Sequence, residues 1–431
     1  MNIDVSLFAK PCSCGRTHQI SVQDIFIEPG AIRRLPGLVA SRGFRVPAIV
    51  CDENTYRAAG AAVRELLPES GLAMLNPDHL HANEHGVAAA EEKLAEMPQA
   101  PDVLLAVGSG TVHDITRFLA HKRGIPFLSV PTAASVDGFV STVAAMTWHG
   151  CKKTLPAVAP ILVAADSDVF SQAPHRLNAS GLSDLLGKYT ALADWKIAHA
   201  VTGEYICERV CQLEYEALDS VLQNLDAIRE GGREACENLM YALLLSGLAM
   251  QMVGNSRPAS GAEHHMSHLW EMEVINAPVD YYHGEKVSVG LVLSSAIYHN
   301  AAALLKKGAY QVKDHMELEM DLLEKSFPDK AMREEIMDEN RPNPLAQIDP
   351  AVLREKAPEI VRIVEEIPAP QELVRLLKQG GCVYSLEGIG LPDSLLEPTA
   401  RISPYVRARL TFMRLLKMFT FEENIFHCEA R

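Results

Sequence analysis

Four of the chain's 16 histidines fall near its middle, in Ser260-Gly-Ala-Glu-His-His-Met-Ser-His-Leu-Trp270 and in Tyr282-His-Gly-Glu-Lys286. His264 and His268 are four residues apart, so on a helix they share one face. His283 follows a break at Pro278. Imidazole is the commonest protein metal ligand. The spacing is compatible with a divalent cation held by two histidines and a carboxylate from elsewhere, and equally with a helix carrying surface histidines.

Asp184 is a candidate for that carboxylate. It lies in Gly181-Leu-Ser-Asp184, at the predicted start of a helix. A carboxylate there interacts favourably with the helix dipole. The two interpretations are a helix cap and the third metal ligand.

A second chemical signal is the junction Gly108-Ser-Gly-Thr-Val-His-Asp114, which follows the apolar run 102–107. Glycines allow the backbone to approach a phosphate, and a helix N-terminus offers unpaired N–H groups. The usual dinucleotide fingerprint requires a glycine where His113 stands. The alternative is an ordinary tight turn between a strand and a helix.

Two further stretches have both a binding and a structural interpretation. Asp52 ends the apolar run 48–51, so it is suited either to bind an adenosine ribose or to cap the next helix. The loop 131–141 is rich in small residues and carries one carboxylate, Asp137. It is suited to lie under a flat ligand or to be a surface crossover.

The segment Cys12-Ser-Cys-Gly-Arg-Thr-His18 has the spacing of half a zinc site. A structural zinc site normally closes with four ligands, and no second half follows nearby. An N-terminal hairpin is the alternative prediction.

Composition limits the class of protein. The chain has 431 residues, a net charge of −15 and scattered cysteines. Its length suggests two domains, and its charge argues against nucleic acid or an anionic membrane as partner. No stretch reads as a signal peptide or reaches the length of a spanning helix. We therefore predict a cytoplasmic protein that is a homo-oligomer, the common default.

The order of elements predicts two domains. Apolar strands and amphipathic helices alternate up to about residue 170, which is typical of a parallel sheet flanked by helices. Long helical patterns follow to the C-terminus, ending in an amphipathic helix over 405–419 with a solvated basic face. We predict an α/β nucleotide-binding domain at 1–172 and an all-α domain at 173–431 that carries the metal and substrate.

Read together, these motifs resemble the superfamily of iron-dependent alcohol dehydrogenases, glycerol dehydrogenase and 3-dehydroquinate synthase. Within it the chain is most similar to the sn-glycerol-1-phosphate dehydrogenase family, through Ser260-Gly-Ala-Glu-His264, Lys188-Tyr-Thr-Ala-Leu-Ala-Asp-Trp195 and the cysteine-rich start. The resemblance implies a dehydroquinate synthase-like fold with the active site in the cleft between the domains.

The resemblance also implies roles for individual residues. The metal ligands would be Asp184, His264 and His283, and the catalytic residues Asp137 and His268. The residues expected to bind the cofactor NAD(H) or NADP(H) are Asp52, Gly108, Ser109, Gly110, Thr111, Asp114, Thr132, Ser135 and Ser141. The candidates for a substrate phosphate are Lys153, Lys188, Arg257 and Lys286.

The expected reaction is reversible reduction of dihydroxyacetone phosphate to sn-glycerol 1-phosphate. The metal (zinc, iron or nickel) would act as a Lewis acid, and the cofactor would carry the hydride. The alternatives are a polyol dehydrogenase with an unphosphorylated substrate, a 3-dehydroquinate synthase-like carbocyclic synthase, and a non-catalytic nucleotide-binding protein. Asp184 disfavours the synthase, whose metal carboxylate is typically glutamate.

Overall fold

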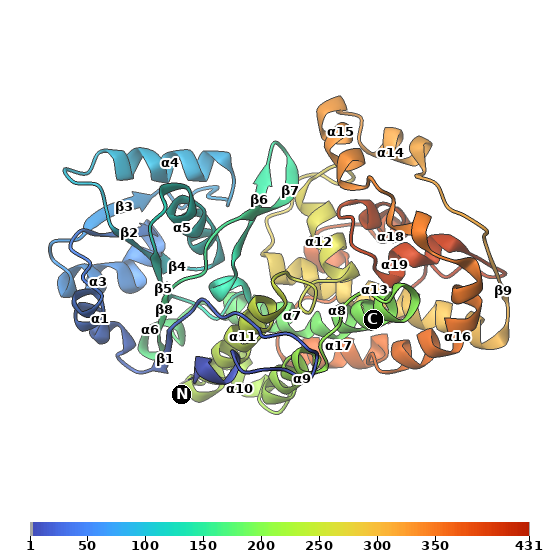
Figure 1. Cartoon of the computed structure of the whole chain (residues 1–431), viewed down its shortest axis with the longest axis horizontal. Coiled ribbons are helices and arrows are strands. Elements are labelled where there is room, and N and C mark those ends of the chain that lie inside the picture. Colours follow the sequence, from blue (N-terminus) through green and yellow to red (C-terminus); the bar gives the residue numbers. More distant parts are fainter. Residues whose placement is uncertain (1–2, 431) are drawn as a thin grey trace. The chain divides into compact units, whose positions relative to one another are not determined.

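Alternate residues of the strands face two different hydrophobic layers. The computed structural model describes residues 3–430. Its first part contains a six-stranded parallel sheet with the strand order β1-β8-β5-β4-β2-β3 (Figure 1). Ile49, Leu105 and Leu128 pack on one face of the sheet. Ala48, Leu104 and Phe127 pack on the other. Because both faces are buried, these strands have nearly continuous apolar sequences.

The strands of this sheet are β1 (Asp24–Glu28), β2 (Pro47–Asp52), β3 (Gly71–Leu75), β4 (Val103–Gly108), β5 (Phe127–Pro131) and β8 (Leu162–Asp166). One face is covered by α1 (Leu35–Ser41), α2 (Glu53–Thr55) with the π-helical turn η3 (Tyr56–Gly60), and α3 (Ala61–Leu66). The other is covered by α4 (Glu84–Ala95) and α5 (Gly110–Arg123). The predicted α/β architecture is therefore confirmed, although β3 was not predicted.

The sheet contains a point where the strand order reverses. From β2 the chain goes to β3 on one side and then to β4 on the other. Val50 pairs with Ala106, so the same register sets Asp52 opposite Gly108 at the carboxyl ends of the two strands. In open parallel sheets, ligands bind at such a switch point.

The chain divides into two compact units that interleave along the sequence. The first contains residues up to 149, 153–185 and 212–256, and the second contains 150–152, 186–211 and 257 onwards. The prediction set one boundary, between residues 172 and 173. To the first unit belong α6 (Ser167–Phe170), α7 (His175–Leu186, except its last residue), α10 (Leu225–Arg229) and α11 (Arg233–Val253).

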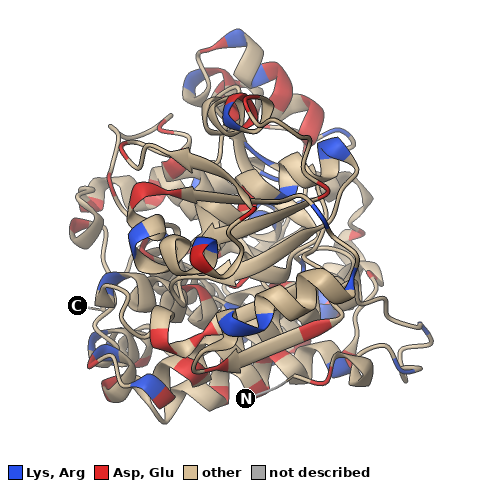
Figure 2. Ribbon diagram, turned by 90° about the vertical axis from the view of Figure 1, so that its left-hand side faces the viewer, with Lys and Arg blue, Asp and Glu red and all other residues tan. Residues whose placement is uncertain are grey.

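Figure 2 shows acidic and basic residues interspersed along the elements that face the viewer.

The second unit is mainly helical. Its central pair is α12 (Ala262–Glu271) and α13 (His283–Lys307). Around the pair lie α8 (Lys188–Thr202), α14 (Met320–Ser326), α15 (Lys330–Glu339), α16 (Pro350–Glu365), α17 (Pro370–Gln379), α18 (Leu396–Ile402) and α19 (Phe412–Leu415), with a small sheet of β9 (Tyr310–Val312) and β10 (Phe419–Phe421). Two elements cross between the units, namely α9 (Glu208–Leu222) and the hairpin of β6 (Val143–Trp148) and β7 (Cys151–Pro156).

The prediction of one amphipathic helix over residues 405–419 is wrong. The segment forms short turns and α19, and Arg414, predicted on a solvated face, is fully buried. Its guanidinium donates to the carbonyl of Pro404 at 2.8 Å and also bonds to Asn340. The apolar residues of this segment do have helical spacing. Its local structure is nevertheless determined by buried hydrogen bonds, including one to Asn340, which is far away in the sequence.

Two helices, α11 and α13, are long and apolar enough to cross a membrane by length and composition. Their apolar windows are 78% and 83% buried inside the protein, respectively. Core helices that are mostly buried inside a protein have the same length and apolar composition.

Candidate active site

The Gly-Ser-Gly junction lies where β4 passes into α5. A Cβ at Gly108 would lie 2.6 Å from the Cβ of Val112, so only glycine allows this tight turn. Ser109 is the N-cap of α5 but makes no side-chain cap bond. The first turn of a 14-residue helix therefore presents backbone N–H groups, as a pyrophosphate site requires.

His113, which departs from the usual fingerprint, is a buried part of this loop. One ring nitrogen, Nδ1, lies 2.9 Å from the carbonyl oxygen of Ser109, and Nε2 lies 2.7 Å from Oγ of Ser129. Burial, and then the charge of Arg117, lower the pKa of His113 to about 3. The imidazole is therefore neutral at physiological pH and stabilises the turn.

Arg117 was not anticipated. It is fully buried one turn further along α5, and it donates to the carbonyl oxygens of Phe139, Ser141 and Val143 at 2.9–3.1 Å. It also lies 3.6 Å from the carboxylate of Asp114, which was predicted to support the cofactor loop. A charged residue on the buried face of a helix was the only available sequence signal. Arg117 links the glycine turn to the segment after Asp137.

Asp52 performs its structural role. Its Oδ1 accepts hydrogen bonds from the backbone N–H groups of Asn54 and Thr55, both at 2.8 Å. The N–H of Asp52 donates to Oγ1 of Thr55 at 3.0 Å, which completes a capping box. The cap uses one carboxylate oxygen. A ribose contact through the other oxygen stays a prediction.

The loop 131–141 contains the other residues predicted to touch the cofactor. Thr132 donates its N–H to the carbonyl of Gly108 at 3.0 Å. Ser141 exchanges hydrogen bonds with Val143. Ser135 is buried, and within residues 3–430 its hydroxyl has no hydrogen-bond partner. A buried hydroxyl without a partner is suited to bind a ligand.

Asp137 and Asp184 are brought together within the first unit. The backbone N–H of Asp137 donates to Oδ2 of Asp184 at 3.0 Å. Ser246 donates to Oδ2 of Asp137 and lies equally close, at 3.1 Å, to Glu214. Both aspartates are nearly fully buried. Glu214 was missed, because nothing in its helical context distinguishes it from a surface acid.

Two glycines allow this approach. A Cβ at Gly181 on α7 would lie 2.1 Å from the carbonyl oxygen of Ala134. One at Gly247 on α11 would lie 2.8 Å from the carbonyl oxygen of Asp137. Both contacts are to backbone atoms, so the loop can rest on these helices only where no side chain intervenes.

The second unit brings the predicted histidines together. The ring centroids of His264 and His283 are 5.2 Å apart, and those of His268 and His283 are 5.5 Å apart. His268, Glu271 and His283 offer ligand atoms within 4.8 Å of one another. The imidazole rings of His264 and His268 on α12 therefore form a cluster with that of His283, the first residue of α13.

Each of the two predicted ligands is oriented by a carboxylate. His264 Nδ1 lies 2.7 Å from Oε1 of Glu263, and His283 Nδ1 lies 2.7 Å from Oε1 of Glu271. Such a bond fixes the ring and leaves Nε2 as the nitrogen for a metal. Lys152 pairs with Glu271 at 2.7 Å. Burial alone would raise the pKa of Glu271, but Lys152 and His283 hold it well below its ordinary value.

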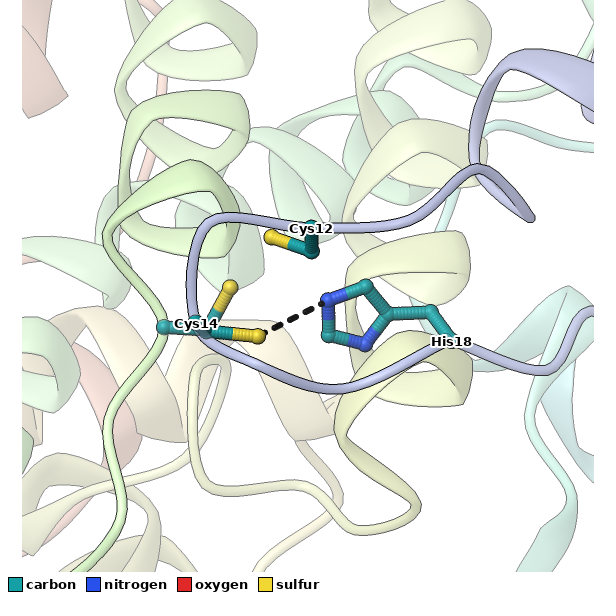
Figure 3. Close-up of side chains that lie close together, drawn as sticks. Cys12, Cys14 and His18 are labelled. Atoms are coloured by element: carbon teal, nitrogen blue, oxygen red, sulfur yellow. Dashed lines mark hydrogen bonds between the residues drawn. The ribbon is translucent and has the colours of Figure 1, made fainter.

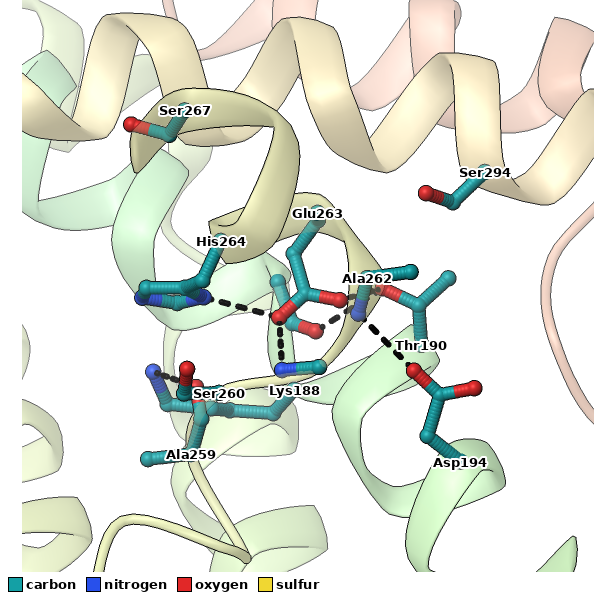
Figure 4. Close-up of polar contacts among 12 residues, drawn as sticks. Lys188, Thr190, Asp194, Ala259, Ser260, Ala262, Glu263, His264, Ser267 and Ser294 are labelled. Carbon is teal, nitrogen blue, oxygen red and sulfur yellow. Dashed lines mark hydrogen bonds and ion pairs between the residues drawn. The ribbon is translucent and has the colours of Figure 1, made fainter. Parts of the chain in front are cut away.

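Behind Glu263 lies a buried polar network (Figure 4). Thr190 Oγ1 and the N–H of Gly261 donate to Glu263, each at 2.5 Å. Asp194 accepts from the N–H of Ala262 at 2.8 Å, and also from Tyr298 and the N–H of Phe412 at 2.7 Å. The network fixes the N-terminus of α12, and with it His264.

Of the cations predicted for a substrate phosphate, three are engaged within the second unit. Lys188 donates to the carbonyl of Ala259 at 3.2 Å, and Lys286 to that of Tyr281 at 2.8 Å. Arg257 pairs with Glu204 at 2.8 Å and also donates to a backbone carbonyl. Lys153 lies on β7 and is half-buried. Contact between any of them and a phosphate stays a prediction.

Comparison with known proteins places the chain in a family. A sequence model of the iron-containing alcohol dehydrogenase family matches residues 26–174. The chain is 42% identical over 297 residues to "Glycerol-1-phosphate dehydrogenase [NAD(P)+]" of Bacillus licheniformis, covering 67% of this chain and 74% of the relative. It is 34% identical over 428 residues to the Geobacillus stearothermophilus protein of that name, covering 97% and 98%.

Solved structures support the fold. A putative alcohol dehydrogenase from Ralstonia eutropha JMP134 superposes with a TM-score of 0.62 at 18% identity, covering 93% of this chain and 96% of that one. A probable glycerol dehydrogenase from Sinorhizobium meliloti 1021 gives 0.59 at 17%, covering 91% and 96%. The predicted resemblance is confirmed, and the chain belongs to the glycerol-1-phosphate dehydrogenase family.

Proposed function

We propose that this protein is an NAD(P)-dependent oxidoreductase that reversibly reduces dihydroxyacetone phosphate to sn-glycerol 1-phosphate. The observation that carries the proposal is the pair His264 and His283, each oriented through Nδ1 by a carboxylate. The near full-length relative named glycerol-1-phosphate dehydrogenase supports the substrate. The cytoplasmic location and the homo-oligomeric state stay predictions.

Asp184, His264 and His283 are the proposed ligands of one divalent metal. The donors fit: two imidazoles with their Nδ1 atoms already bonded, and a nearly fully buried carboxylate held at Oδ2 by the N–H of Asp137. Asp184 is two residues before Leu186, where the chain enters the second unit, so the backbone links it closely to that unit. One carboxylate and two imidazoles leave open positions, as in catalytic sites, and suit zinc, iron(II) or nickel.

When bound, the metal supplies Lewis-acid polarisation of the substrate oxygen, and the nicotinamide supplies or accepts the hydride. The protein positions both. The N–H groups of Gly110 and Thr111 at the start of α5 would bind the pyrophosphate, and the unpartnered hydroxyl of Ser135 would contact the cofactor. A carboxylate at the ribose repels a 2′-phosphate. If Asp52 contacts the ribose, the preferred cofactor is therefore NAD and not NADP.

Proton transfer is assigned to Asp137 or His268. Within the described chain, Nδ1 of His268 has no hydrogen-bond partner, and its ring stacks on that of His283. The carboxylate of Asp137 accepts a hydrogen bond from Ser246, and the backbone N–H of the same residue bonds to Asp184. Either group is suited to exchange a proton with the substrate oxygen.

A second candidate is a polyol dehydrogenase that acts on an unphosphorylated substrate. The observation in its favour is that Lys188, Arg257 and Lys286 are already bonded within the second unit. A substrate without phosphate requires no additional cation.

The test is NADH oxidation with dihydroxyacetone phosphate and with dihydroxyacetone, before and after metal chelation. We expect a strong preference for the phosphorylated ketone, and loss of turnover on chelation and in Asp184→Ala. The matched control is Asp168→Ala, because Asp168 is an exposed acid paired with Arg233. Equal turnover of dihydroxyacetone supports the polyol dehydrogenase. Absence of turnover with either ketone, with NAD still bound, contradicts both.

A further inference from the structure

The N-terminal segment brings together three side chains of types that can ligate a metal, and the proposed reaction does not use them. Cys12, Cys14 and His18 offer ligand atoms within 4.8 Å of one another, and Cys14 Sγ lies 3.5 Å from Nε2 of His18 (Figure 3). All nine cysteines lie in the described part of the chain, and none forms a disulfide there.

A tight turn creates this arrangement. The N–H of Gly15 donates to the carbonyl of Cys12 at 3.0 Å, and the N–H of Cys12 donates to the carbonyl of Arg16 at 3.2 Å. Gly15 has a φ of +82°, a conformation that favours glycine. The reversal directs both thiols and the imidazole toward one point, as Figure 3 shows.

His18 is held in the form that a metal requires. It is 3% exposed, and its Nδ1 lies 2.6 Å from the carbonyl oxygen of Met252 at the end of α11. A carbonyl can only accept, so Nδ1 carries a proton, and in the neutral ring Nε2 presents a lone pair toward Cys14. This outer hydrogen bond is the usual partner of a metal-bound histidine.

We propose that Cys12, Cys14 and His18 bind a structural zinc ion, with Cys207 as the fourth ligand. Cys207 is fully buried and immediately precedes α9, where a helix N-terminus favours a thiolate. The helix α9 continues unbroken into the first unit from Gln212, five residues later. Three cysteines and one histidine form a closed tetrahedral zinc site.

The ion would have a stabilising role. Between the short 3-10 turn η1 (Val5–Leu7) and β1, the N-terminal segment forms no helix or multi-residue strand. The bond from His18 to Met252 ties it to α11, and the ion would tie it to α9 as well. The zinc would therefore anchor the N-terminal segment, independently of the proposed function.

The test uses the full chain with Asp184→Ala and His264→Ala, which removes the proposed active-site metal. Zinc is measured by mass spectrometry after dialysis, with Cys12→Ser/Cys14→Ser as the test and Cys428→Ser as the matched control. We expect one zinc per chain in the background and in the control, and none in the test variant. A background without zinc, or with the Cys12 and Cys14 thiols oxidised to a disulfide, overturns the proposal.

Cobalt substitution tests the ligand set without relying on a variant that fails to fold. Thiolate-to-cobalt charge-transfer absorption grows with the number of thiolates, so Cys207→Ser should lower it by about one third if three thiolates contribute equally. Cys14→His should keep the ion with weaker absorption. Unchanged absorption in Cys207→Ser refutes the fourth ligand. Loss of zinc without any decrease in the thermal midpoint refutes the anchoring role.

Discussion

Gly290 is the position where a single methyl group should separate the two histidine helices. It lies on α13 against the backbone of α12, and an added Cβ would be 2.5 Å from the carbonyl oxygen of Glu263 and 3.0 Å from its Cα. Ordinary contact begins at 3.4 Å, so the carbonyl must move by about 0.9 Å. Neither atom belongs to a flexible side chain. Gly290→Ala must therefore shift the backbone that carries Glu263 and His264.

The shift is large compared with the tolerance of a metal site. Metal–ligand distances hold to roughly ±0.2 Å, and a misplacement of about 1 Å elsewhere in an active site can cost about 100-fold. We expect the affinity for the divalent metal to fall by about 10–100-fold. Overpacking should also lower the free energy of unfolding by about 1–3 kcal/mol.

The assay is competition for the metal against a chromophoric chelator, together with urea unfolding of the metal-free protein. Gly37→Ala is the matched control: it changes a helical glycine in α1 with open space around it and should leave the metal affinity unchanged. The reasoning is refuted if Gly290→Ala binds metal within about twofold of the wild type. In that case α12 and α13 would have accommodated the methyl group without changing the separation of His264 and His283.

Three further variants test neighbouring contacts. Glu263→Gln weakens the partner of His264 Nδ1, so metal affinity should fall by about 10–100-fold in the same competition assay, and an unchanged affinity would exclude the orienting role. Asp194→Asn places an NH2 donor against either the N–H of Ala262, which bonds to Oδ2, or the N–H of Phe412, which bonds to Oδ1, so urea unfolding at pH 8 should show a loss of about 1–3 kcal/mol. His113 has a folded pKa of about 3, below its ordinary 6.5, so its stabilisation is complete above pH 6.5 and is lost as the pH falls. The stability difference between wild type and His113→Gln should therefore shrink by about 2 kcal/mol from pH 6.5 to 5, at about 1.4 kcal/mol per unit, and a constant difference contradicts this account.

Local patterns predicted the parts of the site that local geometry determines. The apolar strand and the glycines at 108 and 110 predicted the turn before α5, because steric demands act over a few residues. The four-residue spacing predicted that His264 and His268 lie on one face of α12. By contrast, Asp137 and Asp184 are in contact although 47 residues separate them in the sequence, and His18 and Met252 although 234 do. Periodicity carries no information about such pairs.

Buried charges produced the main errors. A basic residue at helical spacing predicts a solvated face, and this was wrong for Arg414. Arg117 and Glu214 are fully buried too. Each is stabilised by polar partners that only the tertiary fold supplies, through backbone carbonyls or a hydroxyl. A charged residue satisfied in this way has the same sequence signal as a surface residue.

The metal ligands and their orienting carboxylates are divided between α12 and α13, and this explains why the metal site is sensitive to the distance between the two helices. The helix α12 carries His264 and both orienting carboxylates, Glu263 and Glu271, whereas α13 contributes His283. Glu263 orients a ring on its own helix, so that bond survives a rigid shift of α12. Glu271 orients a ring on the other helix, so the same shift stretches its 2.7 Å bond to His283 as well as the 5.2 Å separation of the two rings. Gly290→Ala should therefore perturb His283 more than His264, and the ring resonances of His283 should shift further in the metal-free protein.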